Sequence, residues 1–143
     1  MTNQNRHLVE QIFQDAQFIQ SIGIRLVGFG KGWCETLVEL SDGHRQQHGF
    51  VHAGVVMTLA DHTSGGAAAS TVPDGSDVIT VENKTSFLRP SSGTVLTCRA
   101  EVLRSGKNLI FVEAEVRSTR NGEHILVAKA SSTLAVIPRR EKK

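Results

Sequence analysis

The sequence predicts an α+β fold in which a curled antiparallel sheet wraps around one long central helix. A helix pattern rich in glycine and alanine starts near Ala53 and ends before the turn signal Pro73-Asp74-Gly75. Several alternating strand patterns separated by hairpin signals follow it. Glycine weakens an isolated helix by about 1 kcal/mol relative to alanine. Its use here therefore indicates that another element packs almost on the helix surface.

The elements follow in an order that fits one domain over residues 1–143. Apolar residues at helical spacing predict an amphipathic N-terminal helix over about residues 6–19, within a helical region of residues 1–20. Residues 138–143, which are rich in charge, are expected to form a flexible tail. The strand patterns cover residues 24–29, 33–40, 78–88, 96–102, 110–116 and 126–136.

Composition narrows the functional classes. A net charge of +2, with dispersed Lys and Arg and no Tyr, does not favour a nucleic-acid-binding protein. Cys34 and Cys98 lie far apart and form no CxxC pair, so we expect buried thiols rather than a disulfide. The polar N-terminus lacks the apolar core of a signal peptide, and no apolar run approaches the roughly 18 residues that would span a membrane. A cytoplasmic location without membrane contact is expected.

Asp61 is the first candidate for chemistry, because it lies in an otherwise small and apolar segment of the central helix. A carboxylate in such surroundings loses hydration, which costs free energy unless the charge is paired or used. The start of the helix, at His52, Ala53 and Gly54, offers free backbone N–H groups to a carbonyl oxygen.

The spacing of these groups predicts an oligomer. Ala53 precedes Asp61 by eight residues, which is about 12 Å along a helix axis. One carbonyl group is therefore out of reach of both when they belong to the same helix. Two antiparallel helices from two subunits would bring the start of one beside Asp61 of the other, so we expect an obligate dimer with two composite sites.

The run His52-Ala53-Gly54 followed by Leu59-Ala60-Asp61 resembles the H-G-G…L-x-D signature of hotdog-fold acyl-CoA thioesterases, in particular the PaaI-like branch named after phenylacetic acid degradation. The resemblance covers nearly the whole chain, including Phe87-Leu88-Arg89-Pro90 and the turn Arg104-Ser105-Gly106-Lys107. It implies a hotdog fold and hydrolysis of aromatic or medium-chain acyl-CoA to the free acid and CoA. We expect a homodimer with shared active sites, assembled further as a dimer of dimers.

The resemblance also implies roles for individual residues. Asp61 would be the nucleophile or the general base that activates water, and Thr80 would supply a hydroxyl that helps to hold this water. The backbone N–H of Ala53, with that of Gly54, would polarise the thioester oxygen, while His52 would help to orient the thioester.

Two positions depart from the family pattern. Relatives usually carry glycine where this chain has Ala53, whose methyl group narrows the site while the N–H is kept. Relatives often carry asparagine at the position of Gln46, which is one methylene longer and would reach the carboxylate or the thioester.

Cations are expected to bind the phosphates of CoA. Arg89, Arg104 and Lys107 lie at strand ends or turns, from which they would reach surface phosphates. A solvated surface charge is the alternative interpretation of each. CoA is part of the substrate, so we expect no further cofactor.

A single carboxylate suits a thioester, because a thiolate leaves readily and an oxyanion donor completes the machinery. The chain contains no G-x-S-x-G motif. Two alternatives stay open. One is a non-catalytic acyl-CoA-binding protein or sensor. The other is a hotdog dehydratase or hydratase, which would need a second acid that the central helix lacks.

A metal site is not expected. His44, His48 and His52 are spaced by four residues, which on a helix would form one face. Gly43 and Gly49 argue against a helix there, and no cysteine or acid completes a ligand set.

Overall fold

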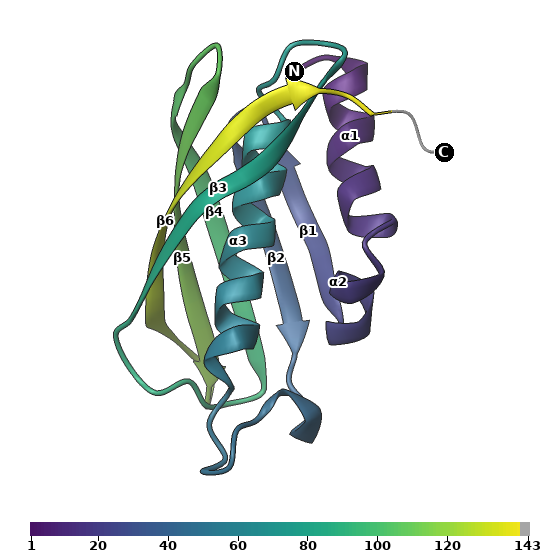
Figure 1. Ribbon diagram of the computed structural model, residues 1–143. Coiled ribbons are helices and arrows are strands. Elements are labelled where there is room, and N and C mark those ends of the chain that lie inside the picture. Colours follow the sequence, from purple (N-terminus) through teal and green to yellow (C-terminus); the bar gives the residue numbers. More distant parts are fainter. Residues whose placement is uncertain (141–143) are drawn as a thin grey trace.

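The computed structural model describes residues 1–140, in which a six-stranded antiparallel sheet curls around the helix α3 (Ala53–Ala69) (Figure 1). The strand order is β1-β2-β4-β5-β6-β3, and β4, β5 and β6 form the expected meander. The predicted architecture is confirmed. The strands are β1 (Ile24–Gly30), β2 (Trp33–Glu39), β3 (Ser76–Phe87), β4 (Val95–Ser105), β5 (Leu109–Arg120) and β6 (Glu123–Pro138), with a short 3-10 helix, η1 (Asp42–His44), before α3.

The N-terminal segment forms two helices, α1 (Asn3–Gln14) and α2 (Gln17–Ile22), so the prediction of one helix over residues 6–19 is wrong. The chain leaves the helical conformation at Ala16 (φ −81°, ψ 94°). Apolar residues keep their helical spacing across this break, which is why periodicity alone did not find it. None of the helices in the described residues is long and apolar enough to cross a bilayer.

Residues near both ends of the described part of the chain are tied to the region where α3 ends. The buried amide of Asn5 donates hydrogen bonds to the carbonyl oxygens of Ala69 and Val72. The backbone N–H of Arg139 donates to Gly75, and its guanidinium donates to Gln11. The expected flexible tail therefore excludes Pro138, which is the last residue of β6, and Arg139. Residues 141–143 of that tail lie outside the described residues.

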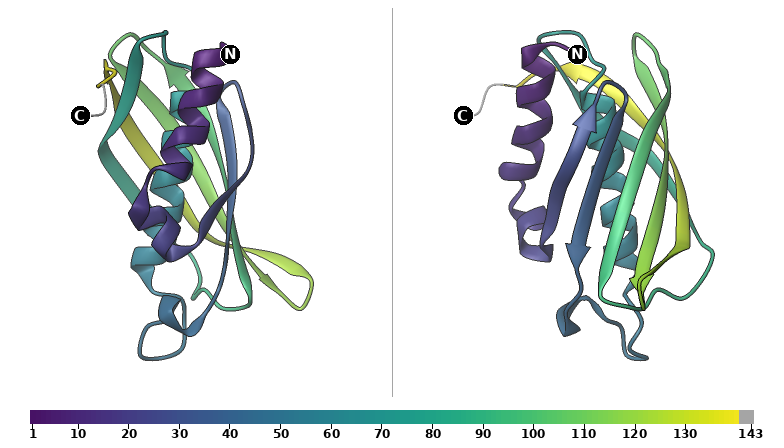
Figure 2. Two further views of the ribbon diagram at one scale, coloured as in Figure 1. Left: turned by 90° about the vertical axis from the view of Figure 1, so that its right-hand side faces the viewer. Right: turned by 180° about the vertical axis from the view of Figure 1, so that it is seen from behind.

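Strand β3 forms one edge of the sheet and pairs with β6 alone among the described residues. Its side chains alternate, and Thr80 points towards α3 while Ile79 and Val81 are more than half exposed. A long edge strand with exposed apolar residues is a template for pairing with another chain. The opposite edge, β1, lies beside α1 and α2 (Figure 2).

Helix α3 packs closely on β2 at one of its two central glycines. A Cβ atom at Gly66 would lie 2.7 Å from Sγ of Cys34 and 3.1 Å from the ring of Phe13, whereas a Cβ at Gly65 would meet nothing within 4 Å. The predicted close approach is confirmed at Gly66. Cys34 and Cys98 are buried free thiols, as expected, and burial raises the pKa of each to about 12.

Alanine at the two glycines is expected to have opposite effects on stability. Gly66→Ala should lower the free energy of unfolding by about 1–3 kcal/mol, because the added methyl overpacks the contact with Cys34. Gly65→Ala is the matched control, and it should raise the same free energy by up to about 1 kcal/mol through helix propensity. Urea unfolding at one protein concentration measures both. Equal effects of the two substitutions would contradict the close packing at Gly66.

The outer face of the sheet is polar around Trp33. The Arg99 guanidinium lies 4.5 Å from the centre of the Trp33 ring and pairs with Glu35 and Glu101. On the other side, the indole covers Gly30, where a Cβ would overlap with it. Trp33 is thus fixed on the surface of the sheet opposite α3.

Candidate functional site

His52 is the N-cap of helix α3, and its side chain caps the helix. Nδ1 of His52 accepts a hydrogen bond from the backbone N–H of Gly54 at 2.8 Å. An imidazole that accepts at Nδ1 in its neutral form carries its hydrogen on Nε2. The cap therefore leaves an exposed Nε2–H donor on His52.

The same cap decides which backbone N–H groups are free. The N–H of Gly54 is engaged by His52 and the N–H of Val55 by the His52 carbonyl, whereas the N–H of Ala53 has no hydrogen-bond partner within residues 1–140. Ala53 is exposed, and it occupies the first turn of α3, where the helix dipole favours negative charge. One backbone donor is thus available for a carbonyl oxygen instead of the expected two.

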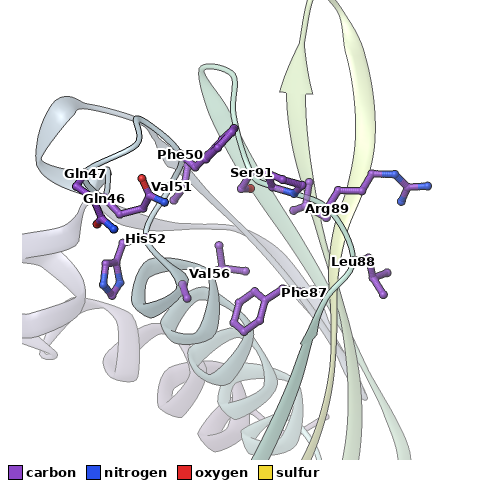
Figure 3. Close-up of a pocket in the computed structure, with 13 residues that line it drawn as sticks. Gln46, Gln47, Phe50, Val51, His52, Val56, Phe87, Leu88, Arg89 and Ser91 are labelled. Atoms are coloured by element: carbon purple, nitrogen blue, oxygen red, sulfur yellow. The ribbon is translucent and has the colours of Figure 1, made fainter.

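A cavity of about 570 Å³ opens at this helix start (Figure 3). Its walls are mainly apolar, and Figure 3 shows Val56 from α3 and Phe87 from the end of β3 facing the same space. Ser91 also lines the cavity, and its buried hydroxyl has no hydrogen-bond partner among the described residues. The full lining is Gln46, Gln47, Phe50, Val51, His52, Ala53, Val56, Phe87, Leu88, Arg89, Pro90, Ser91 and Val127.

Asp61 lies two turns further along α3 and opens into a second cavity, of about 510 Å³. The hydroxyl of Thr80, on β3, donates a hydrogen bond of 2.9 Å to Oδ1 of Asp61. The other carboxylate oxygen, Oδ2, has no such bond within the described chain. The lining of this second cavity is Ala16, Phe18, Ile19, Met57, Thr58, Asp61, His62, Thr80 and Asn83.

One chain does not bring the two halves of the predicted site together. The cavities at Ala53 and at Asp61 have no lining residue in common within residues 1–140. Helix α3 is continuous from Ala53 to Ala69, so the rise between Ala53 and Asp61 is about 12 Å. Thr80 joins Asp61, whereas His52, Gly54 and Gln46 stay with Ala53.

Gln46 lines the cavity at the helix start, but its side chain is occupied locally. Its Oε1 accepts a hydrogen bond from the backbone N–H of His48. The backbone N–H of Gln46 donates to Phe50, which closes the loop before α3. Gln46 makes no hydrogen bond with Asp61 in this chain, and its Nε2 has no hydrogen-bond partner among residues 1–140.

The three predicted phosphate-binding cations lie at two ends of the molecule. Arg89 lines the cavity at the helix start, where its guanidinium donates to the Leu126 carbonyl at 2.8 Å. Arg104 and Lys107 belong to the β4–β5 hairpin, at the end of the sheet where α3 finishes (Figure 1). Ser105, between them, donates a hydrogen bond to Thr71, which follows α3.

Comparison with known proteins identifies the family. The family model described as the thioesterase superfamily matches residues 48–124, which include the whole of α3 and β3. The chain belongs to the thioesterase superfamily. The expected hotdog fold, the PaaI-like resemblance and the expected class of enzyme, a thioester hydrolase, are thereby confirmed.

Solved and curated relatives agree with this assignment. A thioesterase family protein from Silicibacter pomeroyi is 32% identical, with a TM-score of 0.92 over 94% of this chain and 99% of that one. Human acyl-coenzyme A thioesterase 13 is 28% identical over 93% of this chain and 94% of its own. The Escherichia coli PaaI protein from the phenylacetic acid degradation operon shares the fold, with a TM-score of 0.82 over 94% of each chain at 19% identity.

His62 of this thioesterase is a site residue that the sequence did not assign. It follows Asp61 on α3, and burial lowers the pKa of its imidazole. Its Nε2 donates to the Ile12 carbonyl at 3.0 Å, and its ring meets Phe13 edge to face. His62 therefore fastens α1 to α3 beside the carboxylate, and its burial favours the neutral imidazole.

Other lining residues had no sequence signal of their own. Asn83 lies on β3 beyond a bulge at Val81, and its side chain is held by Ser132 and Thr85. Strand alternation would have placed Asn83 on the outer face with Ile79, and the bulge reverses this. Phe50 and Ser91 come from loops, whose side-chain directions no periodicity predicts.

Proposed function

We propose that this thioesterase hydrolyses the thioester of aromatic or medium-chain acyl-CoA, in sites that two subunits build together. The observation that carries the proposal is the division of the machinery on one chain. A free N–H at Ala53 opens into one cavity and the Asp61 carboxylate into another, about 12 Å along the same helix.

The edge of β3 supports a two-fold assembly. It is twelve residues long and unpaired within residues 1–140, and Ile79 and Val81 are exposed on it. Antiparallel pairing of two such edges continues the sheet and sets two α3 helices antiparallel beside each other. The start of one α3 then faces Asp61 of the other, and each dimer contains two equal sites.

Each group in the composite site has a defined task. The Ala53 N–H binds the thioester oxygen and stabilises the negative charge that develops on it. The exposed Nε2–H of His52 and the amide of Gln46 orient the thioester. In the partner subunit, Thr80 holds one oxygen of the Asp61 carboxylate, which leaves the other oxygen to react.

Two routes are open to that carboxylate. Asp61 attacks the carbonyl carbon, the C–S bond breaks and CoA leaves as a thiolate, and water then hydrolyses the resulting anhydride. Alternatively, Asp61 takes a proton from a water molecule whose oxygen attacks the same carbon, after which the C–S bond breaks and CoA leaves as a thiolate. The thiolate needs little help in leaving, so one carboxylate suffices in either route.

Arg89 is the cation best placed for the phosphates of CoA. It is exposed on the rim of the cavity that holds Ala53, which is where the thiol end of CoA would enter. Arg104 and Lys107 lie at the opposite end of the folded subunit from this cavity. They would therefore reach the CoA bound there only from the partner subunit. In an antiparallel dimer, the β4–β5 hairpin of one subunit would lie on the side of the cavity at Ala53 of the other subunit.

Release of CoA from a panel of acyl-CoA substrates tests the proposal. A thiol reagent at neutral pH reads free CoA, because Cys34 and Cys98 are buried and their raised pKa values keep them protonated. We expect thiol release with aromatic or medium-chain substrates and no change in enoyl absorbance. A change in enoyl absorbance without thiol release would indicate a dehydratase or hydratase, and binding without turnover would indicate a sensor.

A further inference from the structure

Helix α2 closes one side of the cavity that contains Asp61. The cavity lies between α3, β3 and the α1–α2 segment, and Figure 1 shows α2 and β3 on either side of α3. Three of its lining residues, Ala16, Phe18 and Ile19, come from this segment, which lies outside the part of the chain that the family model matches.

The cavity that contains Asp61 is lined by both polar and large apolar side chains. Asp61 on α3, and Thr80 and Asn83 on β3, provide polar groups. Phe18 and Met57 provide large apolar side chains, which are 65% and 41% exposed. An apolar wall that continues from a reactive carboxylate fits an apolar group bonded to the carbon that the carboxylate attacks.

The segment that carries Ala16 and Phe18 is held at both ends by hydrogen bonds from imidazole groups to backbone carbonyl oxygens. Nε2 of His62 donates to Ile12 at 3.0 Å, and Nε2 of His44 donates to Ile22 at 2.6 Å. The carbonyl of His44 also accepts the backbone N–H of His52. The segment from Ile12 to Ile22 is thus fixed both to α3, which carries Asp61, and to the loop that precedes α3.

Ala16 occupies the joint between α1 and α2. It is in an extended conformation that any side chain adopts, and its small size leaves room in the cavity. A larger side chain at this position would shorten the space without changing the backbone, and removal of the Phe18 ring would take away the broadest apolar surface.

We propose that α2, together with Met57 of α3, forms the specificity wall of this thioesterase: the acyl group lies against Phe18 and Met57, and Ala16, just before α2, sets the length of acyl group that fits. This rests on the proposed hydrolysis at Asp61. It assigns the acyl group to the carboxylate side and the CoA portion to the cavity at Ala53. Neither Phe18 nor Ala16 touches the reacting atoms.

The dependence of kcat/KM on the length of the acyl chain tests whether α2 forms this wall. We compare kcat/KM for decanoyl-CoA and butyryl-CoA, because each buried methylene contributes about fourfold to affinity. Phe18→Ala and Ala16→Leu should each lower the decanoyl-to-butyryl ratio by at least about tenfold. Phe111→Ala, which removes an exposed ring on the outer face of β5, is the matched control and should leave the ratio unchanged.

The ratio separates specificity from folding or assembly, because a damaged fold lowers both rates together. A ratio that stays at the wild-type value in the folded Phe18→Ala and Ala16→Leu proteins overturns the assignment of the wall while hydrolysis stands. Absence of thiol release from either substrate in the wild-type protein overturns the proposed function as well.

Discussion

Replacement of Asp61 by asparagine is expected to lower kcat by at least about 10²-fold, the usual scale for loss of a positioned base. Asparagine keeps the size of the side chain, and its carbonyl oxygen accepts the hydrogen bond from Thr80. It neither attacks carbon nor takes a proton at neutral pH. Steady-state thiol release gives kcat, and a thermal melt verifies that the fold is retained.

Asp74→Asn is the matched control for this substitution. Asp74 also accepts a hydrogen bond from a threonine hydroxyl, that of Thr2, but it lies beyond the other end of α3. The control should turn over substrate at the wild-type rate. Near wild-type turnover by Asp61→Asn would remove Asp61 from the mechanism, and an unfolded Asp61→Asn protein would assign it a structural role.

Ala53→Pro is expected to lower kcat by about 10²–10³-fold, because it deletes the N–H at the helix start that has no partner among residues 1–140. Proline is well tolerated at the first position of a helix. The preceding residue, His52, already has the extended conformation that proline requires (φ −61°, ψ 137°). Ala53→Gly keeps the N–H and serves as the control, with activity expected near that of the wild type.

The two inactive variants should restore activity when they share a dimer. A mixed dimer of Ala53→Pro and Asp61→Asn subunits has one site in which both changes meet and one site that carries neither. Co-expression with two affinity tags isolates this dimer, and its kcat should be about half that of the wild-type dimer. A stable mixed dimer without activity would show that Ala53 and Asp61 do not serve one substrate across the subunits.

The fold followed from the sequence because its main elements carry local signals. Strand β5, in the middle of the meander, alternates between buried and more exposed residues. The small residues of α3 predicted a close approach of another element, which the structure shows at Gly66. Spacing alone also predicted that Ala53 and Asp61 occupy separate places on one helix, as the two cavities show.

Other features depend on contacts between distant parts of the chain. The break at Ala16 interrupts a run in which apolar residues keep helical spacing before and after it, so no residue type there predicts the break. The side chain of His52 takes up the N–H of Gly54, and this depends on a rotamer rather than on the motif. The bulge at Val81 turns Asn83 inwards without any glycine or proline to mark it.

The position of Trp33 has a practical consequence for these experiments. It is the single tryptophan of a chain without tyrosine, so the intrinsic fluorescence of the protein excited near the indole band comes from one place. That place is the outer face of the sheet, between Gly30 and the guanidinium of Arg99, and neither cavity includes it. Its emission therefore reports the integrity of the sheet independently of turnover, and it distinguishes an inactive folded variant from an unfolded one in the same cuvette.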